Sequence, residues 1–364
     1  METALQQYWN EVNAILSGSG IRHGRKVAAA ALAVAAAGAV FFAVGQERGF
    51  DRTVFLATVA ALDWGWLAVA VAAAYGTYVI RALRWAVLIE PLRPHPRMGK
   101  LLSATIIGYS AVTALGRAAE MVRPYLIANR ENVPFSSQLA AWVVERIYDC
   151  LFALAVFGFA LSEVSGSGVH TGVALSWALR VGGAAIASGA AIGLGLLLAM
   201  KYRSEEIQRW VLRMLGFLAK HHLDRAERLV EGFLGGIRST KSQGATIRLI
   251  AYTFMEWVLV GACYACVLKA FGDVLSPTPA GIAILMGFVS FGSLVQLPAV
   301  GGGAQVTAVL VLTQIFGVPL EVATGMGLML WLVSFVAILP VGAALALHEG
   351  LTWAGLREAE RGAA

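Results

Sequence analysis

Charged residues are scarce in this sequence, and their scarcity excludes a soluble globular protein. Only 14% of the 364 residues are Asp, Glu, Lys or Arg, whereas 58% are hydrophobic. Soluble domains carry about 25% charged residues. Several stretches hold no charge, and each approaches the ~20 apolar residues that a helix needs to cross a bilayer: 27–45, 64–80, 181–200 and 322–347. The sequence therefore predicts an all-α polytopic membrane protein.

Cysteines are equally few. The three cysteines, Cys150, Cys263 and Cys266, are too few for a disulfide framework. Cys263 and Cys266 lie three residues apart in an apolar helical stretch, where core packing explains them better than redox or metal chemistry, which needs an accessible, electropositive site. Neither a metal-ligand cluster nor a nucleophile–base pair is visible, so we expect no metal and no cofactor.

Basic residues gather in three segments, 1–26, 81–100 and 201–246, and are sparse elsewhere. The positive-inside rule places these segments and both termini in the cytoplasm. The net charge of +6 then reflects cytoplasmic loops rather than nucleic-acid binding. Trp64 and Trp85, at the two ends of one apolar stretch, suit an interfacial aromatic belt. We expect a multi-pass protein of the cell inner membrane.

Six full spans are expected, and two further apolar stretches do not fit as simple spans. The stretches 101–130 and 279–316 are interrupted by Gly116 with the charges after it, and by Pro298 with Gly301–Gly303. One half of each is too short for ~30 Å of hydrocarbon. We therefore expect re-entrant helix–break–helix hairpins, the first opening from the cytoplasm and the second from outside. Two pairs of short tilted spans are the alternative. The full spans are predicted at 27–45, 64–82, 138–162, 172–200, 246–270 and 322–347.

The spans divide into two membrane halves joined by an amphipathic linker. Apolar residues recur at helical spacing along 207–233 with charges on the other faces, which predicts helices lying along the membrane interface. The linker is also where a partner enzyme would bind. The expected divisions are a cytoplasmic segment 1–26, a first half 27–200, the linker 201–246, a second half 247–347 and a cytoplasmic tail 348–364.

The first group of charged residues that lie among apolar residues, where a charge costs free energy, belongs to the first hairpin. Arg117, Glu120 and Arg123 follow one another at spacings of three, so they occupy neighbouring faces of one helical turn and a half. Two cations around one anion leave a positive site suited to an anionic headgroup, which Arg binds through two parallel hydrogen bonds. The alternative is an interfacial helix whose arginines reach to the membrane surface.

The second group, Glu145, Arg146 and Asp149, lies two turns into a span. Two acids against one Arg leave a carboxylate for another cation, and we expect Arg117 or Arg123 to lie near this group. A structural salt-bridge cluster and a place on the substrate path explain such buried charges equally well.

A lone acid and a glycine break complete the candidate site. Glu256 has no basic residue near it in sequence; it is protonated, paired with a distant Arg, or used in proton coupling, and the neutral form is favoured because a membrane raises the cost of its charge. Gly301 and Gly302 belong to a helix break whose free N–H groups, with Gln296 and Gln305, are able to bind a polar headgroup.

The charged groups fall in segments that resemble the lysylphosphatidylglycerol synthase transmembrane, or flippase-like, family. The order and spacing match from about residue 25 to 347, although Ala119 stands where the family often has Gly, and Gln305 follows the glycines where the family often has an acid. The resemblance implies that Arg117, Glu120, Arg123, Glu145, Arg146 and Asp149 occupy motif positions. The segments are R-A-L-R-W (81–85), A-L-G-R-A-A-E-M-V-R-P-Y (114–125), V-V-E-R-I-Y-D (143–149) and L-P-A-V-G-G-G (297–303).

This resemblance implies a lipid flippase-like protein. Synthase activity is not implied, because the soluble transferase domain of the lysyl-lipid members does not follow the last span within these residues. We expect a translocator that binds a membrane lipid with a polar, anionic headgroup. The rivals are a transferase acting on a lipid-linked substrate and an accessory subunit of such an enzyme.

Overall fold

The computed structural model describes residues 50–166, 242–293, 296–297 and 301–350, with five isolated helical positions between 188 and 195. The expected span 27–45, most of 172–200 and the 204–238 part of the linker lie outside these residues, so the division into two halves around that linker stays a prediction.

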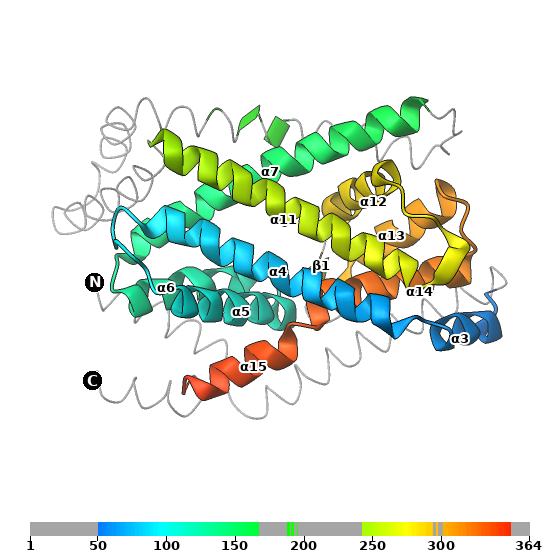
Figure 1. Cartoon of the computed structure of the whole chain (residues 1–364), viewed down its shortest axis with the longest axis horizontal. Helices are drawn as coiled ribbons and strands as arrows, with labels where there is room; N and C mark the ends of the chain where they lie inside the picture. Colours follow the sequence, from blue (N-terminus) through cyan, green and yellow to red (C-terminus); the bar gives the residue numbers. More distant parts are fainter. Residues whose placement is uncertain are drawn as a thin grey trace, which may run out of the picture. The chain divides into compact units, whose positions relative to one another are not determined.

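The described chain is almost wholly helical (Figure 1). One pair of two-residue strands interrupts the helices. The elements are α3 (Arg52–Ala60), α4 (Trp64–Ile89), α5 (Met98–Leu115), η1 (Arg117–Met121), α6 (Val122–Glu131), α7 (Phe135–Gly166), α11 (Gln243–Lys269), η3 (Gly272–Val274), α12 (Pro279–Gly292), β1 (Gln296–Leu297), β2 (Gly301–Gly302), α13 (Gly303–Gln314), α14 (Leu320–Trp331), η4 (Leu332–Val336) and α15 (Leu339–His348).

Three stretches of the described chain are long and apolar enough to cross a membrane: Trp64–Ile89, Gln243–Lys269 and Leu320–His348. They contain the expected spans 64–82 and 322–347 and all but the last residue of 246–270. The helix α7, with 32 residues, covers the expected span 138–162 and at 1.5 Å per residue is also long enough.

Local chemistry sets where these helices begin and end. Asp63 caps α4 by accepting hydrogen bonds from the backbone N–H groups of Gly65 and Trp66. Thr278 caps α12, with Pro279 in its first turn. Gly116 ends α5 at a φ of 80°, a conformation that glycine adopts without strain.

Both expected hairpins contain a helix, a break and a second helix. In the first, Gly116 and the 3₁₀ turn η1 separate α5 from α6. In the second, α12 and α13 are short apolar helices, and between them β1 pairs with β2 so that Gln296 faces Gly302. The breaks are where the glycines predicted them.

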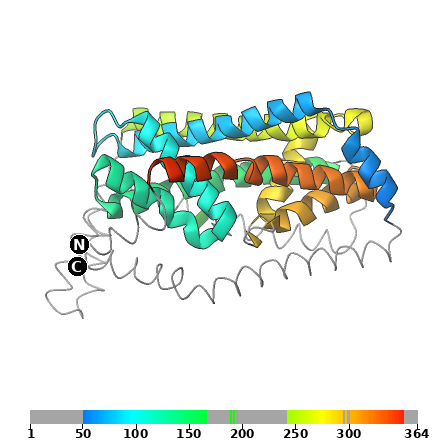
Figure 2. The ribbon, with the colours of Figure 1, turned by 90° about the horizontal axis from the view of Figure 1, so that it is seen from below.

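The last long helix is broken in a way that the sequence analysis did not predict. A π-helical turn, η4, separates α14 from α15, and the three form one broken rod (Figure 2). Hydroxyl groups from α4 and α5 donate to carbonyls in and after this turn. Tyr75 donates to Ala337 at 2.8 Å and Ser110 donates to Ile338 at 3.2 Å. Side chains of two other helices therefore form hydrogen bonds with the backbone beside the break.

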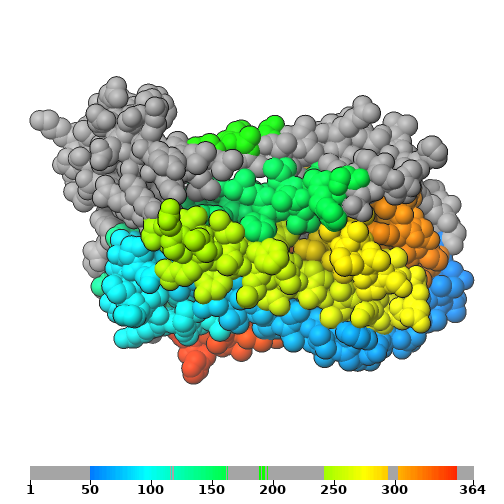
Figure 3. Space-filling model, turned by 45° about the horizontal axis from the view of Figure 1, so that its top comes forward, coloured from blue at the N-terminus to red at the C-terminus, as the bar shows by residue number. Residues whose placement is uncertain are grey.

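The long helices pack in pairs. Helix α4 runs beside α11, α7 packs against α12, and α5 packs against α15 (Figure 1). The surface of α11 stays apolar, and its residues form a large part of the face shown in Figure 3. Such an apolar surface is unusual for a soluble monomer and is suited to hydrocarbon. Its exposed side chains include Ile247, Ile250, Phe254, Met255 and Val258.

Candidate functional site

Two arginines of α4 lie inside the helix bundle. The Arg84 side chain is 1% exposed and that of Arg81 is 18% exposed. The sequence analysis counted both among the charges of a cytoplasmic loop at 81–100, and that assignment is wrong. Helix α4 continues to Ile89, because carboxylates from other helices pair with the two arginines and remove the need for water around them.

Glu256 of α11 provides one of these carboxylates. It lies 2.6 Å from Arg81 and 2.5 Å from Arg84, and the residue is 2% exposed. Of the alternatives open for this residue, the pairing with a distant Arg is the one found.

Arg123 of α6 and Glu145 of α7 form a second buried pair. Both guanidinium Nη atoms donate to the two carboxylate oxygens, the fork-to-fork geometry that Arg alone provides. The expectation that Arg117 or Arg123 would lie near the acids of α7 is therefore confirmed. The Arg123 guanidinium also lies 4.0 Å from the ring centroid of Trp85. Trp85 is fully buried and donates to Gln138, so its expected interfacial position is wrong.

Arg146 and Asp149 of α7 join the two pairs into one network. Arg146 lies 3.0 Å from Asp149 and 3.5 Å from Glu145, and Asp149 is also 2.6 Å from Arg84. Four arginines therefore share three carboxylates within the network. Its members are Arg81, Arg84, Arg123, Arg146, Glu145, Asp149 and Glu256.

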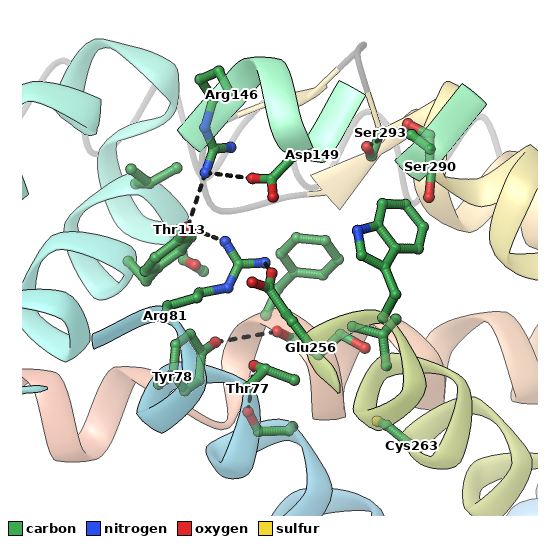
Figure 4. Close-up of a pocket in the computed structure, with 18 of the residues that line it drawn as sticks. Thr77, Tyr78, Arg81, Thr113, Arg146, Asp149, Glu256, Cys263, Ser290 and Ser293 are labelled. Atoms are coloured by element: carbon green, nitrogen blue, oxygen red, sulfur yellow. Dashed lines mark hydrogen bonds and ion pairs between the residues drawn. The ribbon is translucent and has the colours of Figure 1, made fainter. Parts of the chain in front are cut away.

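A cavity of about 410 Å³ opens onto this network, within the range of small-molecule sites. Arg81, Arg123 and Arg146 line it together with carboxylates from η1, α7 and α11. Figure 4 shows Arg81, Arg146, Asp149 and Glu256 around the space, with Ser290 of α12 and Ser293, directly after that helix, on another side. Cationic groups and hydroxyl groups thus face the same volume.

Three donors of the network are left over. The Nε–H groups of Arg81, Arg84 and Arg146 are buried and have no acceptor among the described residues. A buried donor without an acceptor is costly.

The structure brings together only part of the predicted site. Arg123, Arg146, Asp149 and Glu256 line the cavity, as does Glu120, while Glu145 lies behind them, 1% exposed. The sequence analysis missed Arg81 and Arg84 as site residues. Their three-residue spacing, which places both on one side of a helix, was the signal available.

The glycine break makes a different contribution. The backbone N–H of Gly302 donates to the side-chain oxygen of Gln305, so these groups cap α13, and neither residue is among the described ones that line the cavity. The side chains of Arg117 and Gln296 lie outside what the structure describes. Cys263 and Cys266 are buried in the apolar core, as their spacing predicted.

Comparisons with known proteins agree with the membrane fold. The model of the lysylphosphatidylglycerol synthase TM region matches residues 27–342. A curated relative, glycosyltransferase AglD of Haloferax volcanii, is 24% identical over 258 residues, which cover 64% of this chain and 41% of the relative. The chain thus matches about two fifths of the relative's length. No solved structure matches.

Proposed function

Since the chain belongs to the lysylphosphatidylglycerol synthase transmembrane family, a family of multi-pass membrane proteins, we propose that it binds and translocates a lipid with an anionic headgroup. The observation that carries this proposal is the cavity lined by Arg81, Arg123 and Arg146. Three guanidinium groups that face one space favour an anion over a neutral or cationic group.

The broken helices support translocation. The hairpins α5–η1–α6 and α12–β1–β2–α13 are proposed to re-enter the membrane from opposite sides, as discontinuous helices do around the midplane sites of transporters. The headgroup would cross through the cavity, and the acyl chains would stay in hydrocarbon beside apolar faces such as that of α11. We place the protein in the cell inner membrane with both termini in the cytoplasm, working without a cofactor.

A transferase acting on a lipid-linked substrate is the second candidate, because the relative from Haloferax volcanii is named a glycosyltransferase. Such an enzyme needs a carboxylate able to accept a proton. Asp149 lies against Arg84 and Arg146, and Glu256 lies against Arg81 and Arg84. Each of these carboxylates is thus already engaged by two guanidinium groups, which favours binding over catalysis. The accessory-subunit alternative would use the 201–246 linker.

The test is lipid movement in proteoliposomes. Fluorescent phosphatidylglycerol or phosphatidylcholine is placed in both leaflets, and an impermeant quencher reports which label reaches the outside. We expect wild-type protein to expose phosphatidylglycerol faster than phosphatidylcholine. Arg146→Gln should slow that movement at least tenfold, since Arg146 is the most exposed arginine of the network, at 36%. Arg146→Lys should recover only part of it, because Lys lacks the planar fork.

Arg248→Gln is the matched control. Arg248 forms an exposed pair with Glu90 at 2.7 Å, so its loss should leave movement unchanged. Wild-type protein that moves neither lipid, or equal rates for Arg146→Gln and wild type, would refute translocation through this site. Glycosyl transfer to lipid by the purified protein would favour the second candidate.

A further inference from the structure

Tyr109 of α5 stands among the arginines without belonging to the ion network. Its hydroxyl oxygen accepts hydrogen bonds from Arg81 Nη1 and from Arg146 Nη2, the latter at 3.2 Å. These arginines come from α4 and α7, so one phenol oxygen of the first hairpin joins two other helices at the cavity, which Tyr109 itself lines.

The ring of Tyr109 makes a further set of contacts. The guanidinium carbons of Arg81 and Arg123 lie 4.6 Å and 5.2 Å from its centroid, distances at which a cation is attracted to an aromatic face. The ring also packs on Tyr78, with the centroids 5.5 Å apart. Tyr109 therefore contacts all three arginines that line the cavity.

A neutral acceptor has an advantage over a carboxylate at this position. A carboxylate at the position of the Tyr109 hydroxyl would also hold the arginines, but it would add a negative charge beside them and so compete with an anionic ligand. The phenol holds the same guanidinium groups through its dipole and its ring face, and it leaves their charge available.

The hydroxyl proton of Tyr109 is also available. A phenol accepts hydrogen bonds and donates one, and none of the described residues accepts this proton. The same oxygen that orients Arg81 and Arg146 can therefore donate to an anion bound between them.

We propose that Tyr109 is a headgroup-binding residue that donates its hydroxyl proton to a phosphate oxygen of the lipid while it positions Arg81 and Arg146 on the same phosphate. The inference rests on the proposed function and names the part of the headgroup recognised, a phosphate ester. Removing the hydroxyl should weaken binding at unchanged charge.

Binding of phosphatidylglycerol to purified protein in detergent tests this assignment, without a transport step. Tyr109→Phe is expected to weaken binding about tenfold or more, the loss typical of one hydrogen bond to a charged group. Tyr75→Phe is the matched control. It also loses a partly buried hydroxyl, the donor to the Ala337 carbonyl, but this hydroxyl does not contact the arginines. The affinity of Tyr75→Phe for phosphatidylglycerol should stay within about twofold of wild type.

Two further readouts separate recognition from packing. Tyr109→Phe should weaken the binding of phosphatidylglycerol and leave the binding of a phosphate-free lipid such as diacylglycerol unchanged, whereas a purely structural role would weaken both lipids alike. Millimolar inorganic phosphate should not displace the bound lipid; displacement would assign the site to free phosphate instead. If wild type binds phosphatidylglycerol and Tyr109→Phe binds it equally well, the Tyr109 assignment alone is wrong. If wild type binds none, the proposed function fails with it.

Discussion

At the scale of single residues, Arg84 shows how the bundle accommodates charge. Its Nη1 lies 2.6 Å from Asp149 and 2.5 Å from Glu256, and its Nη2 donates to the carbonyl oxygen of Glu145 at 3.2 Å. An unpaired charge among apolar helices is costly. Helix α4 can therefore extend past Arg84 inside the bundle because these three groups contact the Arg84 guanidinium.

Replacing Glu256 by Gln should destabilise the protein by about 3–5 kcal/mol, because Arg81 loses the carboxylate that pairs with it and Arg84 keeps only Asp149. Thermal unfolding of the purified protein in detergent measures the loss as a lower Tm. Glu90→Gln is the control. Glu90 and Arg248 are each 48% exposed, and such surface pairs contribute under about 1 kcal/mol. Equal Tm values for the two variants would contradict the assigned role of Glu256.

The residues that the sequence predicted and those it missed differ in where their partners lie. The group around Glu145 has more acids than bases, and the group around Arg123 has more bases than acids. This difference predicted that the two groups would lie close together. Arg81 and Arg84 were assigned to a loop, because counting charges places any arginine near the end of an apolar stretch outside the membrane. Glu256, more than 170 residues later, is what places them inside, and no local pattern reveals it.

At the scale of elements, α15 approaches α5 at Gly342. A Cβ built on Gly342 would lie 1.8 Å from Ser110 Oγ and 2.4 Å from Ser110 Cβ. The two helices are therefore in backbone-level contact next to the π-helical turn η4, where Ser110 donates to Ile338. Any larger residue at 342 has to separate them.

Gly342→Ala should accordingly destabilise the protein by about 1–3 kcal/mol, the usual cost of overpacking a tight contact. The measurement is again the Tm in detergent. Gly99→Ala provides the comparison, since no atom lies within 4 Å of its added Cβ, and Ala in a helix should stabilise by up to about 1 kcal/mol. A Tm for Gly342→Ala at or above that of Gly99→Ala would show that α15 is free to move away.

Helix breaks were predictable where glycine or proline marks them and hydrophobicity changes nearby. Gly116 and the glycines at 301–303 therefore located both hairpin breaks. The turn η4 was missed because 322–347 has uninterrupted apolar composition, and Pro340 alone does not end a membrane helix. The hydroxyl groups that hold this turn come from α4 and α5, so the information lies in the tertiary structure.

At the scale of the whole molecule, cysteine accessibility tests the topology. Asn129 and Ser276 are both exposed, and each would be replaced by Cys in a Cys150→Ser background, because Cys150 is the exposed native thiol while Cys263 and Cys266 are buried. An impermeant thiol reagent should label position 129 only from the cytoplasmic side and position 276 only from outside. Labelling of both from one side would refute the opposed hairpins.

The ion network also links the synthesis of the protein to the order of its helices. Arg81 enters the membrane with α4, whereas Glu256, the carboxylate with which it pairs, is made only with α11. Until α11 is made, the unpaired Arg81 side chain has to extend toward the lipid headgroups or remain in hydrocarbon, where its charge costs free energy. Helix α4 can therefore reach its final depth only after the later part of the chain has been inserted. The charges that line the cavity thus leave the bundle around α4 unfinished until α11 has been made.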